Sequence, residues 1–355
     1  MTEDALRALC AEIPALDPEL AARTQARLDG KTKPRRSLGK LEDLACRIAA
    51  FTGQATPKLG ERAVVVLAAD HGVAEEGVSA YPQEVTAQMV ANFSRGGAAI
   101  NVLARQANAR IVVADLGVKV PVEPPPEGVR ALRVGPGTRN FTREAAMTRA
   151  QALQAISVGA TIAGELHASG VGLIGIGEMG IANTTSASAL VCAFTGASAE
   201  EVTGRGTGID EAGFLRKLDA IRRALALHRP DARDPLGVLA ALGGFEIAGL
   251  CGVVLGAAAR RVPVITDGFI ASTAALCAAR LEPRAANCLL PSHRSVEVGH
   301  RMVLKALALQ PLFDLDLRLG EGTGAALAMN LVDASLRILD EMATFEAARV
   351  SDSGR

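Results

Sequence analysis

Apolar residues follow two different spacings along the chain, and the change between them predicts helices that alternate with strands. Over residues 5–13 and again over 38–48, leucine and isoleucine recur at the intervals of one helix face. This pattern predicts helical structure from residue 5 to about residue 51, interrupted by a basic loop at 31–37. Ser37 is the expected N-cap of the helix that begins at Leu38.

Continuous apolar runs begin near residue 63 and predict strands that are buried on both faces. The clearest run covers residues 63–69, has valines at its centre and ends before Asp70 and His71. Similar runs cover 110–115, 170–176 and 262–267, and a weaker fifth covers 286–290. Helical patterns separate them, at 83–105, 149–168, 213–227, 245–260 and 271–280. The alternation predicts an α/β fold, a Rossmann-like three-layer α/β/α arrangement with a mostly parallel sheet.

The two ends of the chain carry only helical patterns, which suggests a second domain. After residue 290 helical spacing returns at 295–309 and 324–348. We expect residues 1–60 and 300–348 to form a small helical domain beside a large α/β nucleotide-binding domain of residues 61–299. The polar residues 349–355 are expected to form a disordered tail.

Composition narrows the classes of partner. Lys plus Arg and Asp plus Glu number 38 each, and no dense basic run with interleaved aromatics occurs, so nucleic acid is not an expected partner. The six cysteines form no C-x-x-C pair, which is typical of a reducing compartment. The chain lacks a signal-peptide pattern and a membrane-length apolar run, so we expect a cytoplasmic protein without a membrane partner.

Two glycine-rich segments are candidate phosphate sites, because parallel sheets bind ligands beyond the carboxyl ends of their strands. The first has G-x-G-x-x-G spacing at Gly175, Gly177 and Gly180 and follows a predicted strand. A dinucleotide would also require an acid roughly 20 residues later at a strand end. Glu200 and Glu201 have that separation, but their capping-box spacing with Ser198 favours a short helix. A dinucleotide is disfavoured, and a mononucleotide phosphate remains open.

The second segment, TGRGTG at 203–208, contains Gly206 and precedes Lys217 on a predicted helix. Amides and a cation would suit an anionic ligand, although a surface loop and a solvated lysine fit equally well. The spacing of the five histidines does not suit a metal, and no G-x-S-x-G elbow is present, so we expect neither a metal site nor a hydrolase triad. Asp70 and His71 are candidates for proton transfer or for simple hydrogen bonding at a strand end.

A single carboxylate, Glu321, lies between glycines in the sequence GEGTG at 320–324, just before a long apolar helix. It could complement the helix dipole or accept a proton from a bound ligand. A helix N-terminus lowers the pKa of a carboxyl group and burial raises it, and we expect burial to prevail at Glu321.

Seven segments together resemble the nicotinate-nucleotide–dimethylbenzimidazole phosphoribosyltransferase family of cobalamin biosynthesis. They are SLGKLE (37–42), DHGVAEEGVSAYP (70–82), GEMGIANTT (177–185), TGRGTG (203–208), DGFI (267–270), SHRS (292–295) and RLGEGTGAA (318–326). They occur in the family's order and span residues 31 to 345. Arg36 is a departure, since the family is expected to have glycine there.

The resemblance implies a pentosyltransferase reaction. The 5-phosphoribosyl group of nicotinate mononucleotide would pass to 5,6-dimethylbenzimidazole, giving α-ribazole 5′-phosphate and nicotinate. The leaving pyridine departs neutral, and by resemblance Glu321 removes the proton of the attacking heterocycle. The resemblance also implies a homodimer without cofactor or metal.

The resemblance assigns two groups of binding residues. The benzimidazole pocket would contain Ser79, Ala80, Tyr81, Gln88 and Leu319. The ribose phosphate would contact Gly175, Gly177, Glu178, Gly180, Gly206 and Lys217. Three alternatives remain open, namely a nucleotide-dependent oxidoreductase, a non-catalytic nucleotide sensor, and the same transfer to another base or to a phenol.

Overall fold

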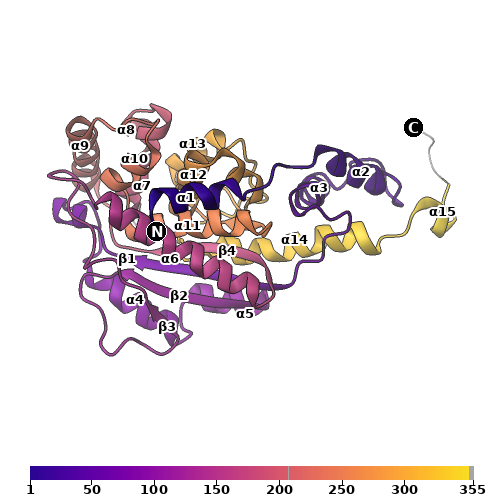
Figure 1. The fold of residues 1–355 in the computed structure, drawn as a ribbon, viewed down its shortest axis with the longest axis horizontal. Helices are drawn as coiled ribbons and strands as arrows, with labels where there is room; N and C mark the ends of the chain where they lie inside the picture. The colour runs from indigo at the N-terminus through magenta and orange to yellow at the C-terminus, as the bar shows by residue number, and fades with distance from the viewer. Residues whose placement is uncertain (207, 352–355) are drawn as a thin grey trace.

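A six-stranded sheet, in which every pairing is parallel, forms the centre of the computed structural model, which describes residues 1–206 and 208–351 (Figure 1). The strands are β1 (Glu61–Ala69), β2 (Ala109–Gly117), β3 (Val129–Ala131), β4 (Val171–Met179), β5 (Val264–Thr266) and β6 (Leu289–Pro291). Their order is β3-β2-β1-β4-β5-β6, so the direction of winding reverses between β1 and β4. Ligands of such sheets bind at this reversal, beyond the carboxyl ends of the strands.

Helices cover both faces of the sheet, which confirms the predicted three-layer α/β/α architecture. On one face Val65 and Leu67 of β1 join the core formed with α6 (Arg149–Ala168), α11 (Phe245–Ala259) and α12 (Phe269–Leu281). On the other face Val64 and Val66 pack with α4 (Glu84–Ser94), α5 (Ala99–Gln106) and α14 (Thr323–Glu341). Alternate side chains of β1 therefore pack into two separate apolar cores, one on each face of the sheet.

The three N-terminal helices pack in two places, one against the helical layer and two beside the far end of α14. Helix α1 (Glu3–Ala11) packs into the core against α11, whereas α2 (Pro18–Asp29) and α3 (Lys40–Thr52) lie beside α14 (Figure 1). Leu28, Ala45 and Leu339 form the small buried cluster that joins α2, α3 and α14. The division of the chain into two domains stays a prediction.

The remaining helical segments are short connections and the helices that surround the carboxyl end of the sheet. They are η1 (Gly72–Glu76), α7 (Asn183–Thr195), α8 (Ala199–Val202), α9 (Glu211–His228), α10 (Pro235–Leu242), η2 (Pro283–Cys288), α13 (Val298–Ala306) and α15 (Phe345–Ala348).

Several predicted boundaries were wrong. The helix expected at 83–105 is two helices, because the chain turns at Gly96, where φ is +77°, and at Gly97. The helix expected at 324–348 ends at Glu341, and α15 follows it separately. Ser37 is not an N-cap: α3 begins at Lys40, and the Leu38 N–H donates to Glu42 Oε1 at 2.9 Å instead.

Among the described residues, no helix is both long enough and apolar enough to cross a membrane. Cys46 is partly exposed and the other five cysteines are buried, as expected of small apolar side chains. Of the predicted tail, residues 352–355 lie outside the part of the chain that the structure describes, while the Val350 N–H still donates to the Phe345 carbonyl.

Candidate active site

The loop at 320–322 is held against the carboxyl end of the sheet by a buried carboxylate, Asp267. Asp267 follows β5, and its Oδ2 accepts from the Gly322 N–H at 3.0 Å. Its Oδ1 accepts from the N–H groups of Gly324 at 2.7 Å and Ala325 at 3.3 Å. Asp267 thus satisfies the free N–H groups at the start of α14, which has no side-chain cap of its own.

The same loop touches the backbone of β4. A Cβ atom at Gly177 would lie 2.5 Å from the Glu321 carbonyl oxygen, so only glycine permits this approach. The prediction that 175–180 forms a turn between strand and helix was wrong in part, because β4 continues to Met179. Gly175 and Gly177 lie inside the strand, where Gly175 pairs with Val64 and faces Ala325 of α14. Their predicted contact with ribose phosphate stays a prediction.

Glu321 combines an unusual backbone with a buried side chain. Its φ is +63°, between Gly320 at +87° and Gly322 at +89°, and only 4% of the residue is exposed. Its Oε2 accepts from the Ile100 N–H at 3.4 Å, at the start of α5. Burial raises the pKa of the carboxyl group and the Ile100 hydrogen bond opposes the rise, so the shift has the expected direction. A carboxyl group with a raised pKa is suited to general-base work near neutral pH.

A second buried acid, Glu178, lies beside this loop at the end of β4. Its Oε2 accepts from Asn183 Nδ2, and its Oε1 would lie 2.5 Å from a Cβ atom at Gly320. Burial, followed by the charge of Glu246, raises the pKa of Glu178 to about 8, while Asn183 opposes the rise. Glu178 is therefore protonated at neutral pH and can donate a hydrogen bond. Burial therefore raises the pKa of both neighbouring carboxyl groups.

A buried cation, Lys217, lies beside the start of α7. Lys217 of α9 is only 1% exposed, and its Nζ donates to Thr184 Oγ1 at 2.8 Å. A Cβ atom at Gly206 would lie 3.5 Å from that Nζ, so Gly206 lies beside the cation. Burial lowers the pKa of Lys217 to about 8, and Glu297 opposes the change. A buried cation beside the first turn of α7 is suited to phosphate.

The sequence predicted Gly206 and Lys217 as site residues, and the structure brings them together with Thr184, for which no separate role was predicted. Residue 207 of the same loop lies outside the described residues. The chain between Glu178 and the helix that contacts Lys217 is short, because Glu178 is the next-to-last residue of β4 and Asn183 begins α7. The connection from β4 to α7 therefore places Glu178 beside the Glu321 loop and Thr184 beside Lys217.

The residues predicted for the benzimidazole pocket come from three parts of the chain. Ser79, Ala80 and Tyr81 lie between η1 and α4, Gln88 lies on α4, and Leu319 precedes the Glu321 loop. Tyr81 is 52% exposed and Leu319 is 58% exposed, which leaves apolar surface available for a ligand or a partner chain. Their roles stay predictions.

Thr86 anchors α4 over the strand ends. Its Oγ1 donates to Asp70 Oδ1 at 2.7 Å and accepts from the Ile181 N–H at 3.2 Å. Asp70 also accepts from the Lys119 N–H at 2.8 Å. Asp70 is therefore engaged in hydrogen bonds that join the segments after β1, β2 and β4.

Three of the five histidines, His71, His293 and His300, are buried and take part in structural contacts, whereas His228 is half-buried and His167 is exposed. His71 Nε2 lies 2.6 Å from Glu246 Oε1, and both side chains are fully buried. Sequence reasoning missed Glu246, although a lone acid at the start of the apolar helix α11 was a signal. Burial lowers the pKa of His293 to about 4 and that of His300 to about 3, so both are neutral near pH 7. The described residues contain no metal-binding group of three or more His, Cys, Asp or Glu side chains.

Glu200 and Glu201, the two acids that could have bound the ribose of a dinucleotide, lie on α8. Glu201 forms the expected capping box with Ser198, whose N–H donates to Glu201 Oε2 at 2.8 Å. Glu200 pairs with Arg222. Both acids lie on the short helix α8 and not at a strand end, which removes the feature that favoured a dinucleotide.

Comparison with known proteins identifies the family. A protein-family profile described as "Phosphoribosyltransferase" matches residues 13–350. A nicotinate-nucleotide–dimethylbenzimidazole phosphoribosyltransferase of Chloroflexus aggregans is 58% identical over 95% of each chain. One from a Geobacter species is 52% identical over 98% of this chain and 99% of its own. The chain belongs to the nicotinate-nucleotide–dimethylbenzimidazole phosphoribosyltransferase family.

Solved structures of this family have the same fold. The crystal structure of CobT from Thermus thermophilus is 48% identical, with a TM-score of 0.91 over 95% of this chain and 100% of that chain. The protein is therefore a phosphoribosyltransferase, and the family resemblance expected from its motifs is confirmed.

Proposed function

We propose that this protein transfers the 5-phosphoribosyl group of nicotinate mononucleotide to 5,6-dimethylbenzimidazole, giving α-ribazole 5′-phosphate and nicotinate. The names of its relatives support this choice of substrates. The observation that carries the proposal is the placement of buried Glu321 on a loop against β4, while buried Lys217 lies by the first turn of the helix that follows β4.

The proposed reaction needs one base and no general acid. One nitrogen of the benzimidazole attacks the anomeric carbon of the ribose and forms the new C–N bond. The bond to the pyridinium nitrogen breaks, and its electron pair returns to nicotinate, which leaves without taking a proton. The other benzimidazole nitrogen then loses its proton to Glu321. Burial raises the pKa of Glu321, which makes the carboxylate a stronger base than an exposed glutamate.

The neighbouring groups have separate tasks in this proposal. Lys217 and the start of α7 hold the 5′-phosphate, with Gly206 allowing its close approach. Protonated Glu178 donates a hydrogen bond to a ribose hydroxyl or to the Glu321 loop. Ser79, Ala80, Tyr81, Gln88 and Leu319 enclose the aromatic base.

The direct test is product analysis. We expect the protein, incubated with nicotinate mononucleotide and 5,6-dimethylbenzimidazole, to release nicotinate and form a product with the mass of α-ribazole 5′-phosphate. A panel containing adenine, other benzimidazoles and a phenol identifies the preferred acceptor. Binding of the nucleotide without nicotinate release would contradict the proposal and favour a sensor.

We further propose that the protein is a homodimer. Large apolar side chains remain exposed on the segments beside the site, at Val296, Val298, Leu315 and Leu319. The segments that carry them run together, since the Val296 N–H donates to the Leu317 carbonyl at 3.1 Å. Light scattering coupled to size exclusion should give a mass of about twice 36.6 kDa. A monomer mass at micromolar concentration would contradict it.

A further inference from the structure

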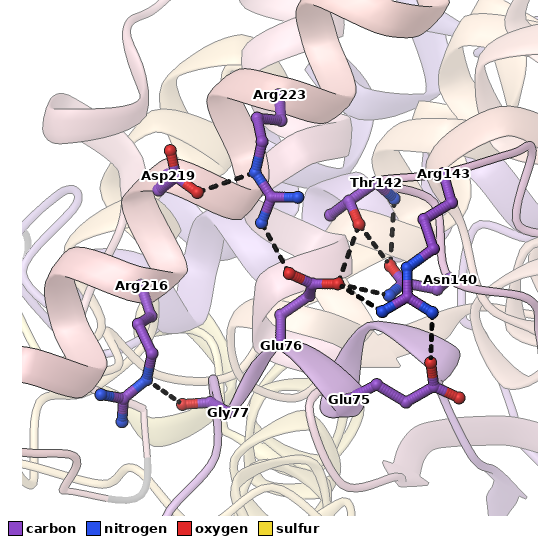
Figure 2. A network of polar contacts seen from close by, with 9 residues as sticks. All are labelled: Glu75, Glu76, Gly77, Asn140, Thr142, Arg143, Arg216, Asp219 and Arg223. Atoms are coloured by element: carbon purple, nitrogen blue, oxygen red, sulfur yellow. Dashed lines mark hydrogen bonds and ion pairs between the residues drawn. The ribbon is translucent and has the colours of Figure 1, made fainter.

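Glu76 lies at the centre of a polar network that no motif assignment uses. It is the last residue of η1, and its side chain is only 15% exposed. Its Oε1 accepts from Asn140 Nδ2 at 2.6 Å and from Thr142 Oγ1 at 3.1 Å, with Arg143 at 3.4 Å (Figure 2). Its Oε2 accepts from Arg223 of α9 at 2.6 Å. One carboxylate thus joins the segment after β1 to two other parts of the molecule.

Two further hydrogen bonds, from Arg223 to Asp219 and from Arg216 to Gly77, support the contact of Glu76 with α9. Arg223 Nε donates to Asp219 Oδ2 at 2.7 Å, one turn earlier on the same helix, so the guanidinium is already oriented when it meets Glu76 (Figure 2). Arg216 Nε donates to the Gly77 carbonyl at 3.0 Å. Two consecutive residues, Glu76 and Gly77, are therefore fastened to α9.

This fastening lies at one end of the loop that carries Ser79, Ala80 and Tyr81. At the other end Gln83 Nε2 donates to the His71 carbonyl at 2.8 Å. Between these two attachments Tyr81 is 52% exposed. Helix α9 also carries Lys217, the residue after Arg216, whose side chain is buried. The same helix therefore supports the predicted acceptor loop and the predicted phosphate site.

We propose that Glu76 is a positioning residue that fixes the acceptor-binding loop, residues 77–83, to α9 and so to the phosphate side of the active site. The inference rests on the proposed function for the identity of the acceptor. Exposed ion pairs contribute little, but this carboxylate is mostly buried and accepts from three neutral or charged partners at 3.1 Å or less. Loss of its charge frees one end of the loop while Lys217 keeps its own contact with Thr184.

The kinetic test compares Glu76→Gln and Arg223→Gln with a matched control, Glu165→Gln. Glu165 pairs with Arg130 at 2.7 Å, also between two elements, near the end of α6 that leads into the start of β4. We expect the first two variants to raise the KM for 5,6-dimethylbenzimidazole about three- to tenfold. The KM for nicotinate mononucleotide should stay within about twofold, as should both KM values of the control.

The loop offers a second readout that needs no turnover. Tyr81 is the only tyrosine and the chain has no tryptophan, so tyrosine fluorescence reports on this loop alone. We expect Glu76→Gln and Arg223→Gln to lower the fluorescence anisotropy of Tyr81, and Glu165→Gln to leave it unchanged. Melting temperatures of all variants separate local loosening from general destabilisation.

The outcomes are distinct. An unchanged acceptor KM and anisotropy, or an equal rise in both KM values, would overturn the inference. If wild-type protein releases no nicotinate, the proposed function fails, and the anisotropy comparison still decides whether Glu76 fixes the loop. If Glu76→Gln does not fold, Arg223→Gln decides the question, because Arg223 is 44% exposed and its loss leaves Glu76 with the hydrogen bonds of Asn140 and Thr142.

Discussion

Glu321 and Glu178 show how two adjacent carboxyl groups acquire different chemistry from their surroundings. Glu321 accepts one long hydrogen bond from a backbone N–H, and burial is the main cause of its raised pKa. Burial also raises the pKa of Glu178. The negative charges of Glu246, Asp267 and Glu321 add to this rise, which brings the pKa to about 8. Near neutral pH the raised pKa of Glu178 favours its protonated form, and Glu321 is the proposed acceptor of the benzimidazole proton.

Replacing each acid by glutamine should separate these roles. We expect Glu321→Gln to lower kcat by about 10²- to 10⁴-fold, because the amide cannot accept the benzimidazole proton. Glu178→Gln should lower kcat by less than about tenfold, because glutamine resembles the protonated carboxyl group. Nicotinate release at saturating substrates measures both, and equal losses would contradict the assignment of Glu321 as the base.

The pH dependence of kcat should also reflect the ionisation of Glu321. Glu321 must be ionised to accept a proton, so kcat falls as the pH drops through its pKa. Because burial raises that pKa, the fall should begin at higher pH than for an exposed glutamate, whose pKa is about 4.3. The measurement is kcat against pH at saturating substrates. A low-pH limb that persists in the residual activity of Glu321→Gln would assign the limb to another group.

At the scale of elements, the site depends on the close approach of the 320–322 loop to β4. Asp267 fixes the loop from the end of β5, and Gly177 provides the space that the loop backbone occupies. The two contacts come from neighbouring strands, since β4 pairs with β5. The position of Glu321 is therefore set by the sheet itself and not by the flexibility of a surface loop.

A methyl group at residue 177 should displace the base. In Gly177→Ala the new Cβ would collide with the backbone of Glu321, and backbone atoms cannot yield as a side chain can. We expect kcat to fall at least tenfold, consistent with the sensitivity of catalysis to misplacement on the order of 1 Å. Gly30→Ala is the control, because its nearest atom would lie 3.6 Å away and its φ is −81°. Wild-type kcat in Gly177→Ala would show that the loop is not held there.

The sequence predicts some elements better than others for physical reasons. Strands β1 and β4 were predicted because a strand buried on both faces is a continuous apolar run. The short edge strand β3 was missed, since three residues that are half-buried or exposed carry no such pattern. Glycine spacing suggested a phosphate turn at 175–180, but Gly175 and Gly177 serve the contact of a strand with α14 and its loop. Spacing alone does not distinguish these two uses of glycine.

The candidate site was predictable to a similar extent. The motifs placed Glu321, Glu178, Gly206 and Lys217 in a shared site, and the structure brings them together in the two pairs described above. The support given by Asp267 and the buried pair of Glu246 with His71 was not predicted. These contacts join residues from distant parts of the chain, and no local pattern records such distances.

At the scale of the whole molecule, α14 connects the site to the N-terminal helices. Its first turn is held by Asp267, and its far end packs on α2 and α3 through Leu339, which is fully buried. The helix therefore spans from the Glu321 loop to α2 and α3, and the prediction had assigned all of these segments to one small domain (Figure 1).

Removing the contact at the far end of α14 should cost stability and spare the chemistry. We expect Leu339→Ala to lower the free energy of unfolding by about 2–5 kcal/mol through the cavity it leaves. Leu227→Ala, at a position 51% exposed on α9, should change it by less than about 0.5 kcal/mol. Urea denaturation measures both, and kcat of folded Leu339→Ala should remain near the wild-type value. An unchanged midpoint would contradict the role of the cluster.

The late position of Glu321 has a consequence for synthesis. All six strands end by residue 291, whereas α14 begins at residue 323 and covers the face formed by Val64, Val66 and Ala68. A nascent chain released before that helix would have a complete sheet with one apolar face covered only in part, by α4 and α5, and it would lack Glu321, the proposed base. Premature termination should therefore yield inert, sticky fragments that chaperones and proteases recognise, and not a partly active enzyme.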